Sequence, residues 1–265
     1  MSKLQSAIRE INRIDDLASS DQWLNNIHPL VKLCLTFVYI AVVVSFDKYN
    51  ILGVAAMIVY PIMMFQIGDI SFVDAMKRLK IILPIVCIVG IFNPFIDTQI
   101  VIVFGTMQIR AGVISMITLI IKGVFTVLAS YILVATTTIE KICYAMRMLH
   151  IPKIFVTEIM LIYRYITLLL TQAHTMSDAY ALRAPGQKGV HYKVWGSFVG
   201  QLILSSVDRA DNIYNAMNLR GYNGEFYCEK IPVVKRDIIF LIIWLTIFVV
   251  CRAINVLSLI GSTFI

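Results

Sequence analysis

The stretch that decides the fold is Val113–Ala135, VISMITLIIKGVFTVLASYILVA. Lys122 is its single charged residue. The run is long enough for an α-helix to cross a hydrocarbon core of about 30 Å. It therefore predicts a membrane-spanning helix.

Further apolar runs lie on both sides of this stretch: Pro29–Phe46, Ile51–Ile67, Ile81–Ile96 and Ile238–Ile254. Apolar residues fill 59% of the 265 positions and charged residues only 15%, with a mean hydropathy of +0.81. A water-soluble globule of this composition would have too little polar surface. The sequence predicts an all-α integral membrane protein with about five spans in the lipid bilayer.

Orientation follows from the lysines and arginines, because positive residues in short flanking segments tend to stay cytoplasmic. Eighteen of the 23 fall on one side of the predicted spans, and the opposite side has only Lys48 and Arg110. We therefore expect a multi-pass protein of the cytoplasmic membrane with its N-terminus inside. The expected parts are 1–135 (N-terminal segment and four spans), 136–236 (cytoplasmic) and 237–265 (last span and external tail).

Segment 136–236 has a net charge of +5, which we interpret as positive-inside topology plus attraction to anionic headgroups. Nucleic-acid binding is not expected, because the charges are spread singly among apolar residues. The pattern predicts two amphipathic helices, Lys153–Ala184 and Gln201–Gly221, joined by a glycine-containing linker. The linker glycines and the apolar stripe of the second helix are Gly186, Gly189, Gly196 and Gly200, and Ile203, Val207, Ala210, Tyr214 and Met217.

The two helices end in similar tripeptides, Leu182-Arg183-Ala184 and Leu219-Arg220-Gly221. In each, a small residue follows the arginine, so another protein's backbone can approach while the guanidinium reaches a carboxylate or carbonyl on it. The alternative is that each arginine only complements the helix dipole, an effect of about 0.3–1 kcal/mol. The duplication favours a partner surface.

These features resemble the transmembrane (T) component of energy-coupling factor (ECF) transporters, the CbiQ/EcfT family, in its cobalt and nickel branch. The resemblance covers nearly the whole chain. Its most specific part is Asp208–Tyr222, DRADNIYNAMNLRGY. Supporting pieces are Tyr163-Arg164-Tyr165, Thr136-Thr137-Thr138, Ile151-Pro152, Ile14-Asp15-Asp16-Leu17-Ala18, His28-Pro29 and Lys32-Leu33.

The resemblance implies a non-catalytic scaffold whose two cytoplasmic coupling helices dock on a pair of ATP-binding cassette ATPase subunits through Arg183 and Arg220. The first motif departs from the family's commonest form, since Leu182 stands where alanine is frequent and Pro185 follows closely. The resemblance also implies a separate membrane-embedded substrate-binding subunit. Cobalt or nickel is the implied cargo, and a vitamin is the alternative.

Three charged residues lie inside predicted spans: Lys32, Lys122 and Arg252. Lys32 and Arg252 are near span ends, where they can snorkel. Lys122 is near the middle, where exposure to lipid would cost about 2.5 kcal/mol or more. We expect it to face protein, either an internal partner such as a backbone carbonyl or an acidic group, or the substrate-binding subunit.

No cofactor, metal site or catalytic residue is expected in this chain. The four histidines and five cysteines show no metal-ligand spacing, and no phosphate-binding loop is present. An intramembrane enzyme using Arg164 and Glu158 is the rival class. A secondary transporter is a third, although internal repeats are not visible. Ile100–Ile109, around Gly105-Thr106, is a predicted external hairpin.

Overall fold

The computed structural model describes residues 3–96, 100–104, 107–186, 189–224 and 231–253. Its compact parts form two units. We call Ala18–Thr138 with Ile231–Ile265 the bundle unit, and Met1–Leu17 with Ile139–Lys230 the paired-helix unit. The predicted division at residues 135 and 236 stays a prediction.

The bundle unit contains most of the predicted apolar segments as helices. Its elements are α2 (Pro29–Ser45), α3 (Ile51–Ala56), α4 (Val59–Ile67), α5 (Phe72–Ile96), β1 (Ile100–Phe104), β2 (Met107–Arg110), α6 (Ala111–Thr136) and α10 (Lys235–Ala253). The predicted hairpin is present, because β1 pairs antiparallel with β2. Its turn, around Gly105-Thr106, lies outside the described residues.

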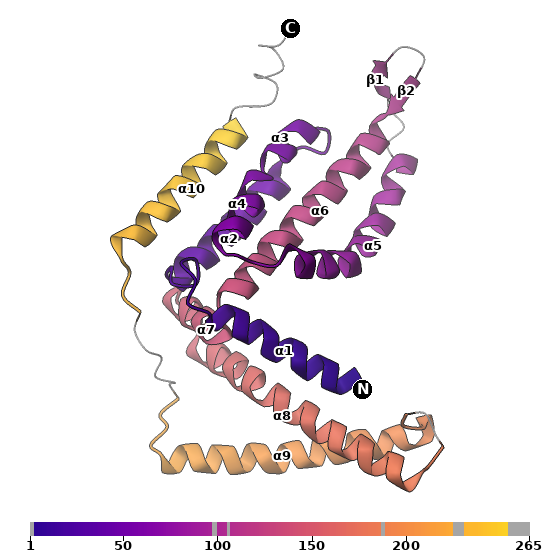
Figure 1. Cartoon of the computed structure of the whole chain (residues 1–265), viewed down its shortest axis with the longest axis vertical. Helices are drawn as coiled ribbons and strands as arrows, with labels where there is room; N and C mark the ends of the chain where they lie inside the picture. The colour runs from indigo at the N-terminus through magenta and orange to yellow at the C-terminus, as the bar shows by residue number, and fades with distance from the viewer. Residues whose placement is uncertain (1–2, 97–99, 105–106, 187–188, 225–230, 254–265) are drawn as a thin grey trace. The chain divides into compact units, whose positions relative to one another are not determined.

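Two predicted spans differ from the structure. The predicted helix Ile51–Ile67 is broken into α3 and α4 around Met57, whose N–H bonds Val54 O at 3.0 Å. The helix predicted from Ile81 begins at Phe72, so α5 includes a charged first part and contains Pro84 inside it. Proline removes a helix hydrogen bond and bends the axis, and Figure 1 shows α5 bent.

The helices α5 and α6 pack side by side (Figure 1). Gly123 on α6 permits a close approach, since a Cβ there would stand 3.0 Å from Val86 Cγ1 on α5. Small residues let helix backbones approach in lipid, where no hydrophobic force draws helices together.

An aromatic cluster holds α2, α4 and α10 together. The rings of Tyr39 and Tyr60 lie 4.4 Å apart, and Tyr60 also contacts Trp244 at 4.9 Å and Phe248 at 5.4 Å. Tyr39 donates a hydrogen bond to the carbonyl of Met57 at 3.0 Å, which satisfies its buried hydroxyl.

Lysines cap helix ends reciprocally between α2 and α6. Lys32 on α2 donates to the carbonyl of Thr136, the last residue of α6, at 2.7 Å. Lys122 on α6 donates to the carbonyls of Val44 (3.1 Å) and Phe46 at the end of α2. The last carbonyls of a helix have no partner within it, so these cations supply the missing donors and match the dipole.

The structure corrects the expectation for Lys32, which is only 5% exposed and capping rather than snorkelling. Arg252 is exposed, and its guanidinium donates to Ser45 O at 3.2 Å.

The paired-helix unit consists of α1 (Lys3–Ser19), whose last residues belong to the bundle unit, α7 (Ile139–Met148), α8 (Lys153–Arg183), the short 3-10 helix η1 (Tyr192–Val194) and α9 (Trp195–Leu219). The predicted ends of α8 and α9 are close to the observed ones. The predicted start of α9 was wrong: Gly196 and Gly200 lie inside it rather than in a linker. α1 and α7 were not predicted as helices.

By length and composition, α6 and α8 can each cross a membrane, and the shorter helix α2 and the segment Ile51–Ile67, which holds α3 and α4, are also apolar. Together with the predominance of helices, this describes a helical membrane protein. The sequence analysis placed α8 on the cytoplasmic side instead, and that placement stays a prediction.

Candidate functional site

The end of α9 is built by a glycine with positive φ. Gly221 has φ +77°, which a residue with a side chain rarely adopts. This conformation turns the chain so that the N–H of Tyr222 bonds Met217 O and that of Gly221 bonds Asn218 O, both at 3.0 Å. The pattern is a Schellman cap, and it places Arg220 just beyond the last helical residue.

The end of α8 is less regular. Ala184 closes the helix with its N–H bonded to Tyr180 O at 3.0 Å, and Gly186 has φ +93°. Pro185 between them cannot continue the hydrogen-bond pattern. Arg183 is therefore the last residue of α8, and the helix stops directly after it.

Both arginine ends are open on the surface of the chain. Leu182 is 85% exposed and Leu219 90% exposed, and Arg183 and Arg220 are exposed as well. Within the described part of the chain, neither guanidinium forms a hydrogen bond or ion pair. The structure therefore shows no bond from these arginines to their own helix-end carbonyls.

The two ends lie far apart along the helix pair. Near its middle, α8 meets α9 through Gln172, which bonds Ser205, and Arg209 bonds the same Gln172 at 3.5 Å. Arg220 lies beside Leu161 and Arg164, in the first half of α8. At about 1.5 Å per helical residue, Arg183 is roughly 28 Å further along α8 than Arg164. The geometry offers two separate arginine sites, not one composite site.

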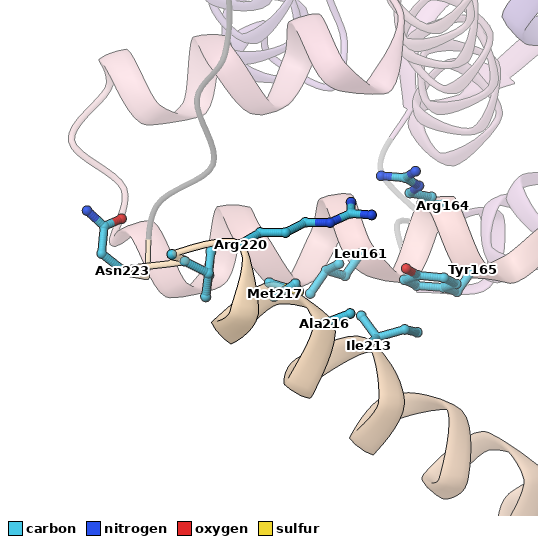
Figure 2. A pocket seen from close by; sticks show the side chains of 10 residues that line it. Leu161, Arg164, Tyr165, Ile213, Ala216, Met217, Arg220 and Asn223 are labelled. Carbon is cyan, nitrogen blue, oxygen red and sulfur yellow. The ribbon is translucent and has the colours of Figure 1, made fainter.

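A cavity of about 340 Å³ surrounds Arg220. Its walls come from the end of α9 and from α8, and the lining residues are Leu161, Arg164, Tyr165, Ile213, Ala216, Met217, Arg220, Gly221, Tyr222 and Asn223. Figure 2 shows the guanidinium groups of Arg220 and Arg164 on the same side of the apolar Leu161 and Met217. We call this cavity the two-arginine pocket.

An apolar groove of about 570 Å³ adjoins the two-arginine pocket. Leu161, Tyr165, Ile213, Met217 and Tyr222 line both. The groove continues along Ile154, Ile162, Ile166 and Tyr214. The described residues leave most of the predicted apolar stripe of α9 uncovered, since Ile203, Val207 and Tyr214 are all more than half exposed.

Motif pieces that are distant in sequence meet in the structure. Tyr163 donates a hydrogen bond to Asp15 Oδ1 on α1 at 2.5 Å. Lys32 joins Thr136, as described above. Arg164, which sequence reasoning considered only as a rival catalytic residue, shares a pocket with Arg220. Sequence spacing gave no signal for this last pairing.

Lys122 has the internal partners expected in one of its two interpretations, the carbonyls of Val44 and Phe46. Its contact with another subunit stays a prediction. Glu158 and Arg164 form no ion pair with each other among the described residues, and Glu158 lines the apolar groove. Over the same residues, no three His, Cys, Asp or Glu side chains lie close enough to hold a metal ion.

Known proteins include relatives of this chain. The chain is 27% identical over 232 residues to the uncharacterized protein MJ1571 of Methanocaldococcus jannaschii, covering 83% of this chain and 78% of the relative. A family model described as CbiQ, cobalt transport protein, matches residues 20–230. The match includes the Asp208–Tyr222 stretch and both arginine ends. The chain therefore belongs to the CbiQ family of cobalt transport proteins and is a component of a membrane transport system.

Proposed function

We propose that this chain is the transmembrane scaffold subunit of an ATP-driven importer of the ECF type. It has five spans with the N-terminus in the cytoplasm, and α8 and α9 are its cytoplasmic coupling helices. Leu182-Arg183-Ala184 docks on one ATP-binding subunit and Leu219-Arg220-Gly221 on the other. The chain itself is non-catalytic.

One observation carries the proposal: both arginine ends are exposed and have no bonding partner among the described residues, at separated places on one helix pair. Two separated arginine ends are suited to contact two ATPases that move relative to each other when they bind nucleotide. If each arginine only complemented its helix dipole, the leucine beside it would not need to be exposed. The same motif would also not need to occur at both helix ends.

The intramembrane-enzyme alternative is weaker. Acid–base catalysis needs a proton-transferring group and its polar partner at one site, whereas Arg164 lines the two-arginine pocket, Glu158 lines the apolar groove, and the two form no ion pair among the described residues. The cargo proposal, cobalt or nickel delivered by a separate substrate-binding subunit, rests on the family name, with a vitamin as the alternative cargo.

The docking proposal is tested by replacing both Arg183 and Arg220 with alanine. The double variant should insert in the membrane and elute as a monodisperse species in detergent, yet lose its ATP-binding subunits on co-purification. Arg209→Ala is the matched control, because Arg209 is also on α9 but bonds Gln172 within the chain. Undiminished co-purification of the double variant would refute docking through these ends.

A further inference from the structure

We propose that Arg164 and Arg220 together form a seat for one carboxylate side chain of the ATP-binding partner, with an apolar side chain next to that carboxylate entering the adjoining groove. The inference rests on the proposed docking function and deepens it. It adds Arg164, on the other helix, to the recognition site at the end of α9, and it names the chemistry that the site accepts.

The charge of the two-arginine pocket argues for an anion. Two guanidinium groups from different helices line one cavity of about 340 Å³. Neither has an ion-pair partner in the described ranges, although the paired-helix unit includes acidic residues such as Asp208 and Asp211 on α9 itself. Like charges that share a site repel, so an incoming carboxylate gains from both.

The geometry of guanidinium groups favours a carboxylate. Each presents a planar fork of donors that matches two oxygens, and two forks can bind one carboxylate from different sides. Arg220 is held at the Schellman cap of α9 and Arg164 inside α8, so neither backbone position has to be ordered on binding. Pre-ordered groups lose less entropy when the partner arrives.

The apolar walls argue for a protein partner over a free anion or a lipid headgroup. Met217, Leu161 and Tyr165 separate the pocket from the larger groove and line both. A free phosphate would leave the groove empty. A protein segment with an acidic residue beside an apolar one would fill both, and aromatic walls with an arginine are typical of interface centres.

The seat is tested by affinity measurements between the full-length subunit in lipid nanodiscs and the ATP-binding subunits encoded with it. Arg164→Ala and Arg220→Ala should each weaken binding roughly 10- to 100-fold, because each removes charge-assisted hydrogen bonds. The double variant should lose less than the product of the two single effects, since both arginines contact one group. Arg209→Ala should stay within about twofold.

A charge-swap experiment identifies the carboxylate. Each acidic residue on the contacting face of the ATP-binding subunit is replaced by lysine, and binding is measured to the Arg164→Glu, Arg220→Glu subunit. One lysine replacement should restore affinity to this double variant while weakening binding to the unaltered chain. Restoration by none of them overturns the seat.

Other outcomes separate the seat from the docking function. If Arg220→Ala weakens binding but Arg164→Ala behaves like Arg209→Ala, the shared seat is wrong and docking stands. If neither the Arg183, Arg220 double variant nor Arg164→Ala weakens binding, docking itself fails.

If Arg164→Ala is misfolded, Arg164→Lys is used, and it should bind more weakly than the unaltered chain with an unchanged melting temperature. If Arg164→Ala and Arg220→Ala bind phosphatidylglycerol vesicles more weakly but bind the ATP-binding subunits unchanged, the pocket belongs to lipid and the proposal is overturned.

Discussion

At the scale of single residues, the three cations that lie within predicted spans bind the carbonyls at helix ends. Lys32 caps α6, while Lys122 and Arg252 cap α2. A cation buried in an apolar environment is costly, but an uncapped helix end is costly too. A cation that binds the free carbonyls of a neighbouring helix end removes both costs. These contacts also fix the position of α2 along α6.

Replacing Lys32 with methionine should therefore destabilise the protein. The carbonyl of Thr136 would lose its 2.7 Å bond in a buried position, and an unsatisfied buried acceptor costs about 1–3 kcal/mol. Unfolding in detergent, followed by circular dichroism with increasing denaturant, measures the change.

The matched control is Lys77→Met, on α5 in the same unit. Lys77 pairs with Asp74 at 3.3 Å, but its side chain is 69% exposed, and surface pairs contribute about 0–1 kcal/mol. Equal stability of the two variants would show that the Lys32 cap is energetically unimportant.

At the scale of elements, the conformation of one glycine decides where α9 ends and where Arg220 stands. Gly221→Ala should destabilise this end by about 1–2 kcal/mol, because alanine at φ +77° brings its Cβ close to the backbone carbonyl. Amide hydrogen exchange at Arg220–Tyr222 should become faster, and ATPase affinity should fall with it.

Gly200→Ala provides the opposite case on the same helix. Gly200 lies inside α9, and a Cβ there meets nothing within 4 Å. Alanine in a helix interior is favoured over glycine by about 0.5–1 kcal/mol, so this variant should be at least as stable as the unaltered chain. If both glycine variants behave alike, the Schellman cap does not control the end of α9.

At the scale of the whole molecule, the main question is whether α8 lies in the cytoplasm or crosses the membrane. Its length and composition permit a crossing. In that case Arg164 and Glu158 would enter the hydrocarbon, at about 2.5–3.5 kcal/mol for each charged residue near the centre. We infer that α8 lies outside the membrane core, with its exposed apolar face covered by another subunit or the membrane surface.

Cysteine labelling tests this topology. In a chain whose native cysteines are replaced by serine, Lys48→Cys should react with a membrane-impermeant maleimide on intact cells. Lys193→Cys, which follows α8, should react only after the membrane is permeabilised. Labelling of Lys193→Cys on intact cells would mean that α8 is a span, and the orientation of everything after it would be reversed.

Sequence reasoning located most helices, because their boundaries depend on local signals. Apolar runs marked α2, α6 and α10, and Gly221 marked the end of α9. It missed the break between α3 and α4, although Pro61 lies four residues after Met57 and has no N–H to donate to the Met57 carbonyl. It also placed Gly196 and Gly200 in a linker, since glycine lowers helix propensity but does not forbid a helix.

The candidate site was only half predictable. Arg183 and Arg220 could be selected because their neighbours repeat, Leu-Arg followed by a small residue. The shared pocket of Arg164 and Arg220 could not be predicted, because it depends on which turn of α8 lies beside the end of α9. The same holds for Tyr163 with Asp15 and for Lys32 with Thr136.

The sequence by itself determined that this chain is helical, that it is a membrane protein and that two of its helices end at an arginine. Hydropathy, spacing and helix caps act over a few residues, so they can be read along the chain. Only the tertiary structure decided which charges meet: the lysine of one helix at the end of another, and two arginines in one pocket. Such meetings depend on how far each helix runs before it contacts its neighbour, and packing between helices sets that distance.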